Sequence, residues 1–120
     1  MLYNSDTKEL IERIPHLAEY NEILSRLKQE EILDIKAEIN IKVGIEEVKV
    51  SGWLPGSDWT GTPFAPIFVA CKSNRELAGK IFGLFVWDVM MKRTDDWSFI
   101  RGAKIGEVPI ESTVYFKIEL

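Results

Sequence analysis

The sequence predicts an α+β domain. N-terminal amphipathic helices precede a mostly antiparallel sheet of about four to five strands, and one apolar core helix packs on that sheet. Three observations lead to this prediction. Apolar residues recur at helical spacing over residues 17–27, alternate with polar residues over 33–43, and occupy nearly every position of 77–91. Helical and strand patterns therefore lie in separate stretches of the chain.

The N-terminal part is expected to be helical. Asp6 and Glu9 have the spacing of a capping box, which would open a short helix through about Ile14. Pro15 then either kinks this helix or occupies the first turn of a second one. The second helix follows from an apolar stripe at spacings of three and four, formed by Leu17, Tyr20, Leu24 and Leu27.

Alternation with a period of two predicts the first strands of the sheet. Apolar residues occupy every second position over residues 33–43, which is typical of a strand with one buried face. Gly44 interrupts the pattern. Val48 and Val50 resume it in a second strand that could include Trp53, giving a hairpin. Helix-forming residues within 33–43 could extend the preceding helix a little, but the alternation favours a strand.

A buried strand and the core helix follow. The apolar run at residues 67–71 is short enough for a buried strand. Ser73 and Glu76 form a second capping box, and the helix that starts there is apolar nearly all round and runs to about Lys92. Further strands are expected at residues 97–100 and at the end of the chain, where the alternating residues are Val114, Phe116, Ile118 and Leu120.

Length and composition favour one soluble domain spanning residues 1–120. The apolar fraction is 46% and the charged fraction is 28%, as in ordinary globular proteins. The net charge is −4, and residues 1–50 carry eleven acidic against seven basic side chains. No basic stripe offers itself to phosphates, so we expect no nucleic-acid partner. A single cysteine, no signal-like N-terminus and no membrane-length apolar run favour a cytoplasmic protein without a membrane partner.

The most informative segment is residues 52–66. It holds three of the eight glycines, three of the five prolines and two of the four tryptophans. This composition is unsuited to a regular helix or strand and is common in functional loops. The candidate partner- or ligand-binding residues are Trp53, Asp58, Trp59 and Phe64, because aromatic rings offer large contact areas and a carboxylate accepts hydrogen bonds. The same aromatics could instead pack over a sheet edge, with Asp58 capping a turn.

Other reactive residues form no recognisable catalytic or metal site. Cys71 could be an activated thiol at a helix N-terminus, but a base is missing nearby because the only histidine is His16, and a buried inert cysteine explains it as well. Asp88 stands out because its helix is otherwise apolar, and a buried carboxylate requires a partner. Asp95 and Asp96 have a turn composition. Phosphate loops, nucleophile elbows, zinc signatures and calcium loops are absent, so no cofactor or metal is expected.

These observations favour a small non-enzymatic protein-interaction or accessory module that uses residues 52–66 as its contact surface. The alternative is a small-molecule-binding protein or enzyme. Its pocket would lie between the 52–66 loop and the 73–92 helix, where Asp58, Cys71 or Asp88 would supply the polar contacts.

Self-association is a third possibility. Gly79 and Gly83 form a smooth stripe on the core helix, which lets another backbone approach closely. That backbone belongs either to the same chain or to a second copy. An exposed edge of the expected 33–43 strand offers another route to a homodimer.

Overall fold

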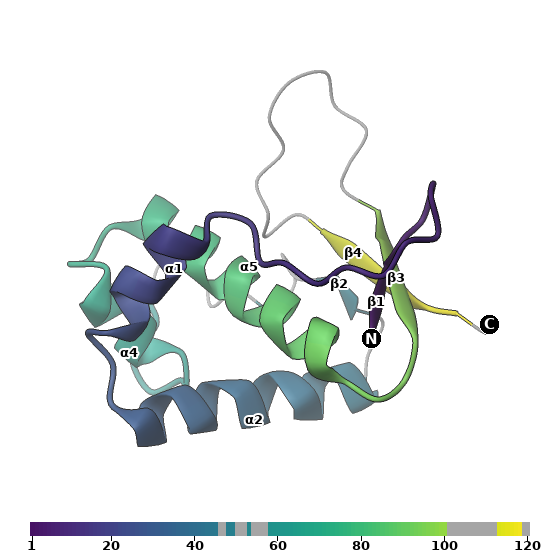
Figure 1. The fold of residues 1–120 in the computed structure, drawn as a ribbon. Coiled ribbons are helices and arrows are strands. Elements are labelled where there is room, and N and C mark those ends of the chain that lie inside the picture. The colour runs from purple at the N-terminus through teal and green to yellow at the C-terminus, as the bar shows by residue number, and fades with distance from the viewer. Residues whose placement is uncertain (46–47, 50–52, 54–57, 101–112, 119–120) are drawn as a thin grey trace.

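The computed structural model describes residues 1–45, 48–49, 53, 58–100 and 113–118, and it has an α+β architecture (Figure 1). The elements in chain order are β1 (Leu2–Asn4), α1 (Leu17–Leu24), α2 (Gln29–Ile45), β2 (Val48–Lys49), α4 (Ala65–Ala70), α5 (Arg75–Lys92), β3 (Trp97–Ile100) and β4 (Val114–Lys117). In Figure 1 the helices gather around α5, and the strands lie beyond its C-terminal end. No helix within the described ranges is long and apolar enough to cross a bilayer.

The sheet is mixed, so the predicted sheet of four to five mostly antiparallel strands is wrong. The strand order is β1-β3-β4-β2. β1 runs parallel to β3, with Leu2 opposite Trp97, whereas β4 pairs antiparallel with β3 on its other side. β2 adds only two residues to the outer edge of β4. The sheet therefore consists mainly of β1, β3 and β4.

Residues 33–43 lie within helix α2 and do not form a strand, which corrects the prediction for this stretch. The buried side chains are Ile35, Ile39 and Val43, which are four residues apart. A spacing of four is twice the period of a strand and close to one turn of a helix, so the same residues satisfy both patterns. The alanine, glutamate and lysine residues between them favour the helix.

The run at residues 67–71 is also helical, because it belongs to α4 and its C-terminal cap. Ile67, Ala70 and Cys71 are buried, while Val69 is exposed. This one-sided burial at spacings of three and four is the pattern of an amphipathic helix. A proline in the first turn supports the start of the helix, because the N–H that proline lacks would have no helical partner there.

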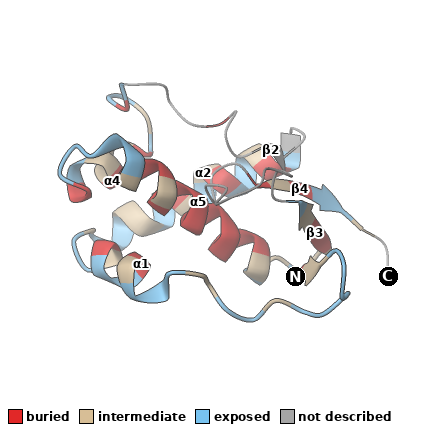
Figure 2. Cartoon of the chain, turned by 90° about the horizontal axis from the view of Figure 1, so that it is seen from above, coloured by how far each residue is buried: buried red, intermediate tan, exposed pale blue. Residues whose placement is uncertain are grey.

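Helix α5 is the central core element, but it packs mainly on other helices and not on the sheet as predicted. It contacts α1, α2 and α4, and its C-terminal half reaches the sheet, where the ring centres of Trp87 and Phe99 are 4.8 Å apart. Figure 2 shows the band of buried residues along α5. The N-cap is Asn74 and not Ser73, and its side chain accepts a hydrogen bond from the Leu77 N–H.

The predicted helix at the N-terminus is absent, and the capping box at Asp6 does not form. Asn4 Oδ1 instead accepts hydrogen bonds from the backbone N–H groups of Asp6 and the next residue, which turns the chain back. The returning segment lies beside β1 through an antiparallel bridge between Tyr3 and Leu10. The second expected helix is present as α1, and Pro15 lies just before it.

The strand expected at residues 97–100 is confirmed as β3. A final strand is also present as β4, but its buried face is the opposite of the expected one. Tyr115 is 1% exposed, whereas Phe116 is 36% exposed. Two residues of the predicted strands, Val50 and Leu120, lie outside the described residues.

Candidate functional site

The aromatic rings of the 52–66 segment that the structure describes lie inside the protein. Trp53, Trp59 and Phe64 are 6%, 4% and 3% exposed. The ring centres of Trp59 and Phe68 are 5.8 Å apart in a stacked arrangement, and Phe64 lies edge-on to a ring of α5 at 4.7 Å. In this conformation the three aromatics are core residues.

Asp58, the fourth candidate of this segment, is exposed and serves the local turn. Its Oδ1 accepts a hydrogen bond from the backbone N–H of Thr60 at 2.9 Å. Hydrogen bonds from Thr60 lower the pKa of the Asp58 carboxyl below its usual value. The carboxylate therefore stabilises the turn that leads toward α4.

Asp58 lies in the turn before α4, Cys71 caps the C-terminal end of α4, and Asp88 lies in α5. Cys71 is 2% exposed at the C-terminal end of α4, and burial raises the pKa of its thiol to about 11. A protonated thiol that solvent cannot reach is a poor nucleophile. Gly79 and Gly83, the stripe considered for self-association, are buried within α5.

Asp88 has the partners that a buried carboxylate requires. Its Oδ2 accepts a hydrogen bond from the Tyr20 hydroxyl at 2.8 Å and lies 3.1 Å from Lys36 Nζ. Its Oδ1 lies 2.6 Å from Lys92 Nζ. Burial alone would raise the pKa of Asp88, but the bonds from Lys92, Tyr20 and Lys36 bring it below the usual value. Burial, together with the adjacent carboxylate, raises the pKa of the Tyr20 hydroxyl. This cluster joins α1 and α2 to α5, which is a structural role.

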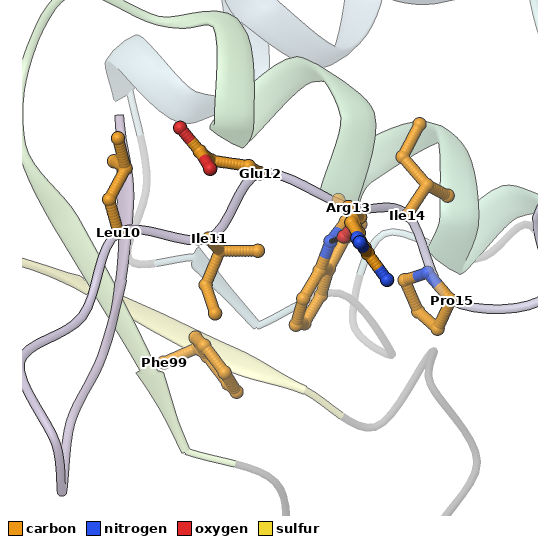
Figure 3. Close-up of a pocket in the computed structure, with 8 residues that line it drawn as sticks. Leu10, Ile11, Glu12, Arg13, Ile14, Pro15 and Phe99 are labelled. Carbon is orange, nitrogen blue, oxygen red and sulfur yellow. Dashed lines mark hydrogen bonds between the residues drawn. The ribbon is translucent and has the colours of Figure 1, made fainter.

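An open hollow of about 610 Å³ lies between residues 10–15, α5 and β3 (Figure 3). Its lining residues are Leu10, Ile11, Glu12, Arg13, Ile14, Pro15, Trp87 and Phe99. In Figure 3 the side chain of Ile11 points toward Phe99, whereas the Glu12 carboxylate points away from it. Trp87 Nε1 donates a hydrogen bond to the Arg13 carbonyl at 3.1 Å, so the indole N–H already has a partner within the protein. The hollow offers apolar contact without a set of convergent catalytic groups.

A second surface lies along α2 and α4, and we call it the α2–α4 surface. It is defined by the hollow-lining residues Asp34, Ala37, Glu38, Ile41, Pro63, Pro66 and Val69, together with Glu30 and Leu33, which are exposed on α2 one helical turn before Asp34 and Ala37. Two open hollows of about 470 Å³ each lie on it, and Glu31 and Pro66 line both of them. The two hollows therefore adjoin and form one trough between the helices.

The α2 side of this surface carries a second apolar stripe. Leu33, Ala37 and Ile41 are all exposed, with Leu33 at 58% and Ile41 at 55%. At about 100° per residue, this stripe lies opposite the buried stripe of the same helix. On α4, Val69 is 74% exposed. Only one of the two apolar stripes of α2 is therefore covered by the core of the described chain.

Acidic side chains border the exposed stripe. Glu30, Asp34 and Glu38 are four residues apart, so they form a row along α2 next to the apolar residues. None of these three carboxylates forms an ion pair with any residue that the structure describes. The surface thus combines exposed apolar side chains with carboxylates that no basic residue of the described chain neutralises.

The sequence alone does not identify this surface, because the alternation at residues 33–43 predicts a strand where the structure has helix α2. The signal was the alternation itself. It contains two interleaved series with a spacing of four, one beginning at Leu33 and the other at Ile35. On a helix the two series occupy opposite faces, which identifies an exposed stripe as soon as the helix is recognised.

Comparison with known proteins finds no matching family model, no matching curated protein and no matching solved structure. Within the described ranges, no three His, Cys, Asp or Glu side chains gather into a group that could hold a metal ion. Function is therefore inferred from the surfaces of the chain itself.

Proposed function

We propose that the chain is a non-enzymatic protein-interaction module and that the α2–α4 surface is its contact surface. The observation that carries the proposal is the second apolar stripe of α2. Leu33 and Ile41 are more than half exposed on the face opposite the buried one. A helix that is apolar on both faces is typical of an element covered on both sides, and a contiguous exposed apolar patch is typical of interaction sites.

Burial by a partner would give a clear gain in free energy. Fully burying an aliphatic side chain contributes roughly 1.5–3 kcal/mol relative to leaving it exposed. Leu33, Ile41 and Val69 are each more than half exposed, so a partner that buries them would gain much of this free energy at each residue. Three such residues are enough for the apolar centre of a small interface, where a few residues supply most of the binding energy.

The 52–66 segment contributes to this surface through its prolines and not through its tryptophans. Pro63 and Pro66 line the trough beside α2, whereas Trp59 and Phe64 are buried. A proline has a fixed φ angle, so its ring loses little freedom when a partner binds. The contact surface proposed here therefore differs from the aromatic one that the sequence suggested.

The test is a double substitution, Leu33→Ser with Ile41→Ser, compared with Leu17→Ser as a matched control. Leu17 is also an exposed apolar residue on a helix, at 50% exposure, but it lies on α1. Partner capture from a lysate is quantified by mass spectrometry for each variant. We expect the double substitution to remove captured proteins that the control retains.

Urea unfolding of each variant shows whether the fold is preserved. Substitutions of exposed residues usually change the free energy of unfolding by less than about 0.5 kcal/mol, so all variants should unfold near the same urea concentration. Identical capture by the double variant and the control would contradict the proposed contact surface.

A further inference from the structure

We infer that the segment bound at the α2–α4 surface is a cationic amphipathic helix. This helix would have apolar residues on one face and lysine or arginine residues beside them. The inference rests on the interaction function proposed above and adds the chemical class of the partner. Two features support it, the shape of the trough and the charge along its edge.

The shape of the trough suits a helix. The stripe from Leu33 to Ile41 is about 12 Å long at a rise of 1.5 Å per residue, which matches about two turns of a second helix. Ala37 and Ile41 of this stripe line the trough, and Leu33 extends the stripe beyond it. Pro63 and Pro66 line the same hollow as Ala37 and Ile41, and Val69 of α4 lines the adjoining hollow. A groove between two helices with apolar walls accepts the i, i+3 and i+4 side chains of an amphipathic helix.

The charge at the edge of the trough specifies a basic partner. Asp34 and Glu38 line the trough, and Glu30 continues their row along α2. None of the three has a basic partner among the described residues. An exposed ion pair contributes only about 0.2–1 kcal/mol. A row of carboxylates nevertheless speeds the approach of a basic segment and sets its register.

The charges also predict an orientation for the bound helix. Asp34 and Glu38 line one hollow, whereas Arg26 and Lys72 line the other. Arg26 is already bonded to Glu22 at 2.9 Å, while Lys72 forms no ion pair within the described part of the chain. The basic residues of the partner should therefore lie over the acidic end, with neutral or acidic residues near Lys72.

A second copy of the chain fits this surface less well. In an antiparallel pair of α2 helices related by a two-fold axis, the row formed by Glu30, Asp34 and Glu38 would face its own copy. The net charge of −4 adds further repulsion between two chains. Repulsion of the same kind opposes binding to an anionic lipid surface.

The experiment uses synthetic helical peptides of about 18 residues with leucines on one face, the usual form of a helix that binds a groove. One peptide carries lysines beside the leucines, and a matched peptide carries glutamates at the same positions. Each is titrated into the isotopically labelled chain and followed by NMR. We expect the lysine peptide to shift resonances of α2 and α4 and to bind at least about tenfold more tightly than the glutamate peptide.

Substitutions in the chain then test the two features separately. Asp34→Asn with Glu38→Gln should weaken binding of the lysine peptide about tenfold and reduce its salt dependence. Glu9→Gln with Glu12→Gln is the matched control, because both residues are exposed and lie elsewhere. Leu33→Ser with Ile41→Ser should abolish binding, whereas Leu17→Ser should leave it unchanged.

The possible outcomes separate the partner class from the proposed function. If the Leu33 and Ile41 substitutions abolish binding but the charge substitutions have no effect, the cationic partner is wrong and the interaction surface stands. If neither pair of substitutions has an effect, both proposals fail. Sedimentation of the chain alone provides the third outcome: a dimer that Leu33→Ser with Ile41→Ser dissociates would identify a second copy as the occupant and overturn the inference.

Discussion

The Tyr20 hydroxyl lies 2.8 Å from Oδ2 of Asp88, a residue that follows 68 positions later in the chain. Both residues are buried, so the hydrogen bond joins α1 to α5 within the core. The Tyr20 ring is held separately by an edge-on contact with Phe85, with ring centres 5.2 Å apart. Removal of the hydroxyl alone should therefore leave the ring in place and report on the hydrogen bond.

The substitution Tyr20→Phe should lower the free energy of unfolding by about 1.5–3 kcal/mol, because a buried carboxylate loses a hydrogen bond. Urea unfolding measures the change. The control is Tyr3→Phe, because the Tyr3 hydroxyl donates to the sulfur of Met1 at the surface and to no other described residue. An equal loss of stability in both variants would show that the Tyr20 hydroxyl has no special role.

Stability should decrease in acid. Hydrogen bonds from Arg93 lower the pKa of Asp95 to about 2, and the pKa of Asp88 is also lowered. Because the folded pKa lies below the unfolded one, the unfolded state binds protons more readily as the pH falls. The contribution of Asp95 is complete above about pH 4 and is lost between about pH 4 and pH 2.

This pH dependence can be assigned by substitution. Asp95→Asn should flatten the loss of stability between about pH 4 and pH 2, as measured by urea midpoints at each pH. Asp6→Asn serves as the control, because it removes an exposed carboxylate that has no ion pair among the described residues. If Asp95→Asn left the loss of stability between about pH 4 and pH 2 unchanged, Asp95 would not be its source.

Cys71 should react slowly with thiol reagents in the folded protein. Its side chain is 2% exposed and its pKa is raised to about 11, so little thiolate is present near pH 8. The reaction is measured by the absorbance of the chromophore that the reagent releases. The reaction of Cys71 should become faster when urea unfolds the chain. A chain with Cys71→Ala and Ser5→Cys provides an exposed thiol for comparison. If Cys71 in the folded protein reacted as fast as the exposed thiol, its surroundings would have to open to solvent readily, which would contradict the prediction.

The register of β4 predicts different effects for two neighbouring aromatic residues. Tyr115→Ala should lower the free energy of unfolding by about 3–5 kcal/mol, because a large ring is lost from the core. Phe116→Ala should cost less than about 1 kcal/mol, because that side chain is partly exposed. Calorimetry or urea unfolding compares the two variants. The reverse order would indicate that Phe116 faces the core, as the sequence alone suggested.

Elements with strong local signals could be predicted from the sequence. The α5 helix has a nearly continuous apolar sequence and a capping residue close to the predicted start, and α1 has apolar residues at helical spacing. Residues 33–43 misled the prediction because apolar residues at every second position include a series at every fourth. For residues 67–71, the run was too short to distinguish a strand from a single helical turn.

Features that depend on distant contacts could not be predicted. β1 has only three residues, and its pairing partner β3 lies at the other end of the chain. The burial of Trp59 and Phe64 depends on rings of α4 and α5, which local composition does not reveal. The α2–α4 surface depends on both the helical state of α2 and the position of Pro66 beside it.

The parallel pairing of β1 with β3 also has a consequence for the speed of folding. It joins Leu2 to Trp97, so a loop of about 95 residues must close before the pair can form. The helices α1, α2, α4 and α5 lie inside this loop and are stabilised largely by contacts within it. Closing so long a loop costs conformational entropy before the contacts between β1 and β3 can repay it. We therefore expect the docking of β1 to limit the folding rate, and the chain to fold more slowly than a helical bundle of similar length.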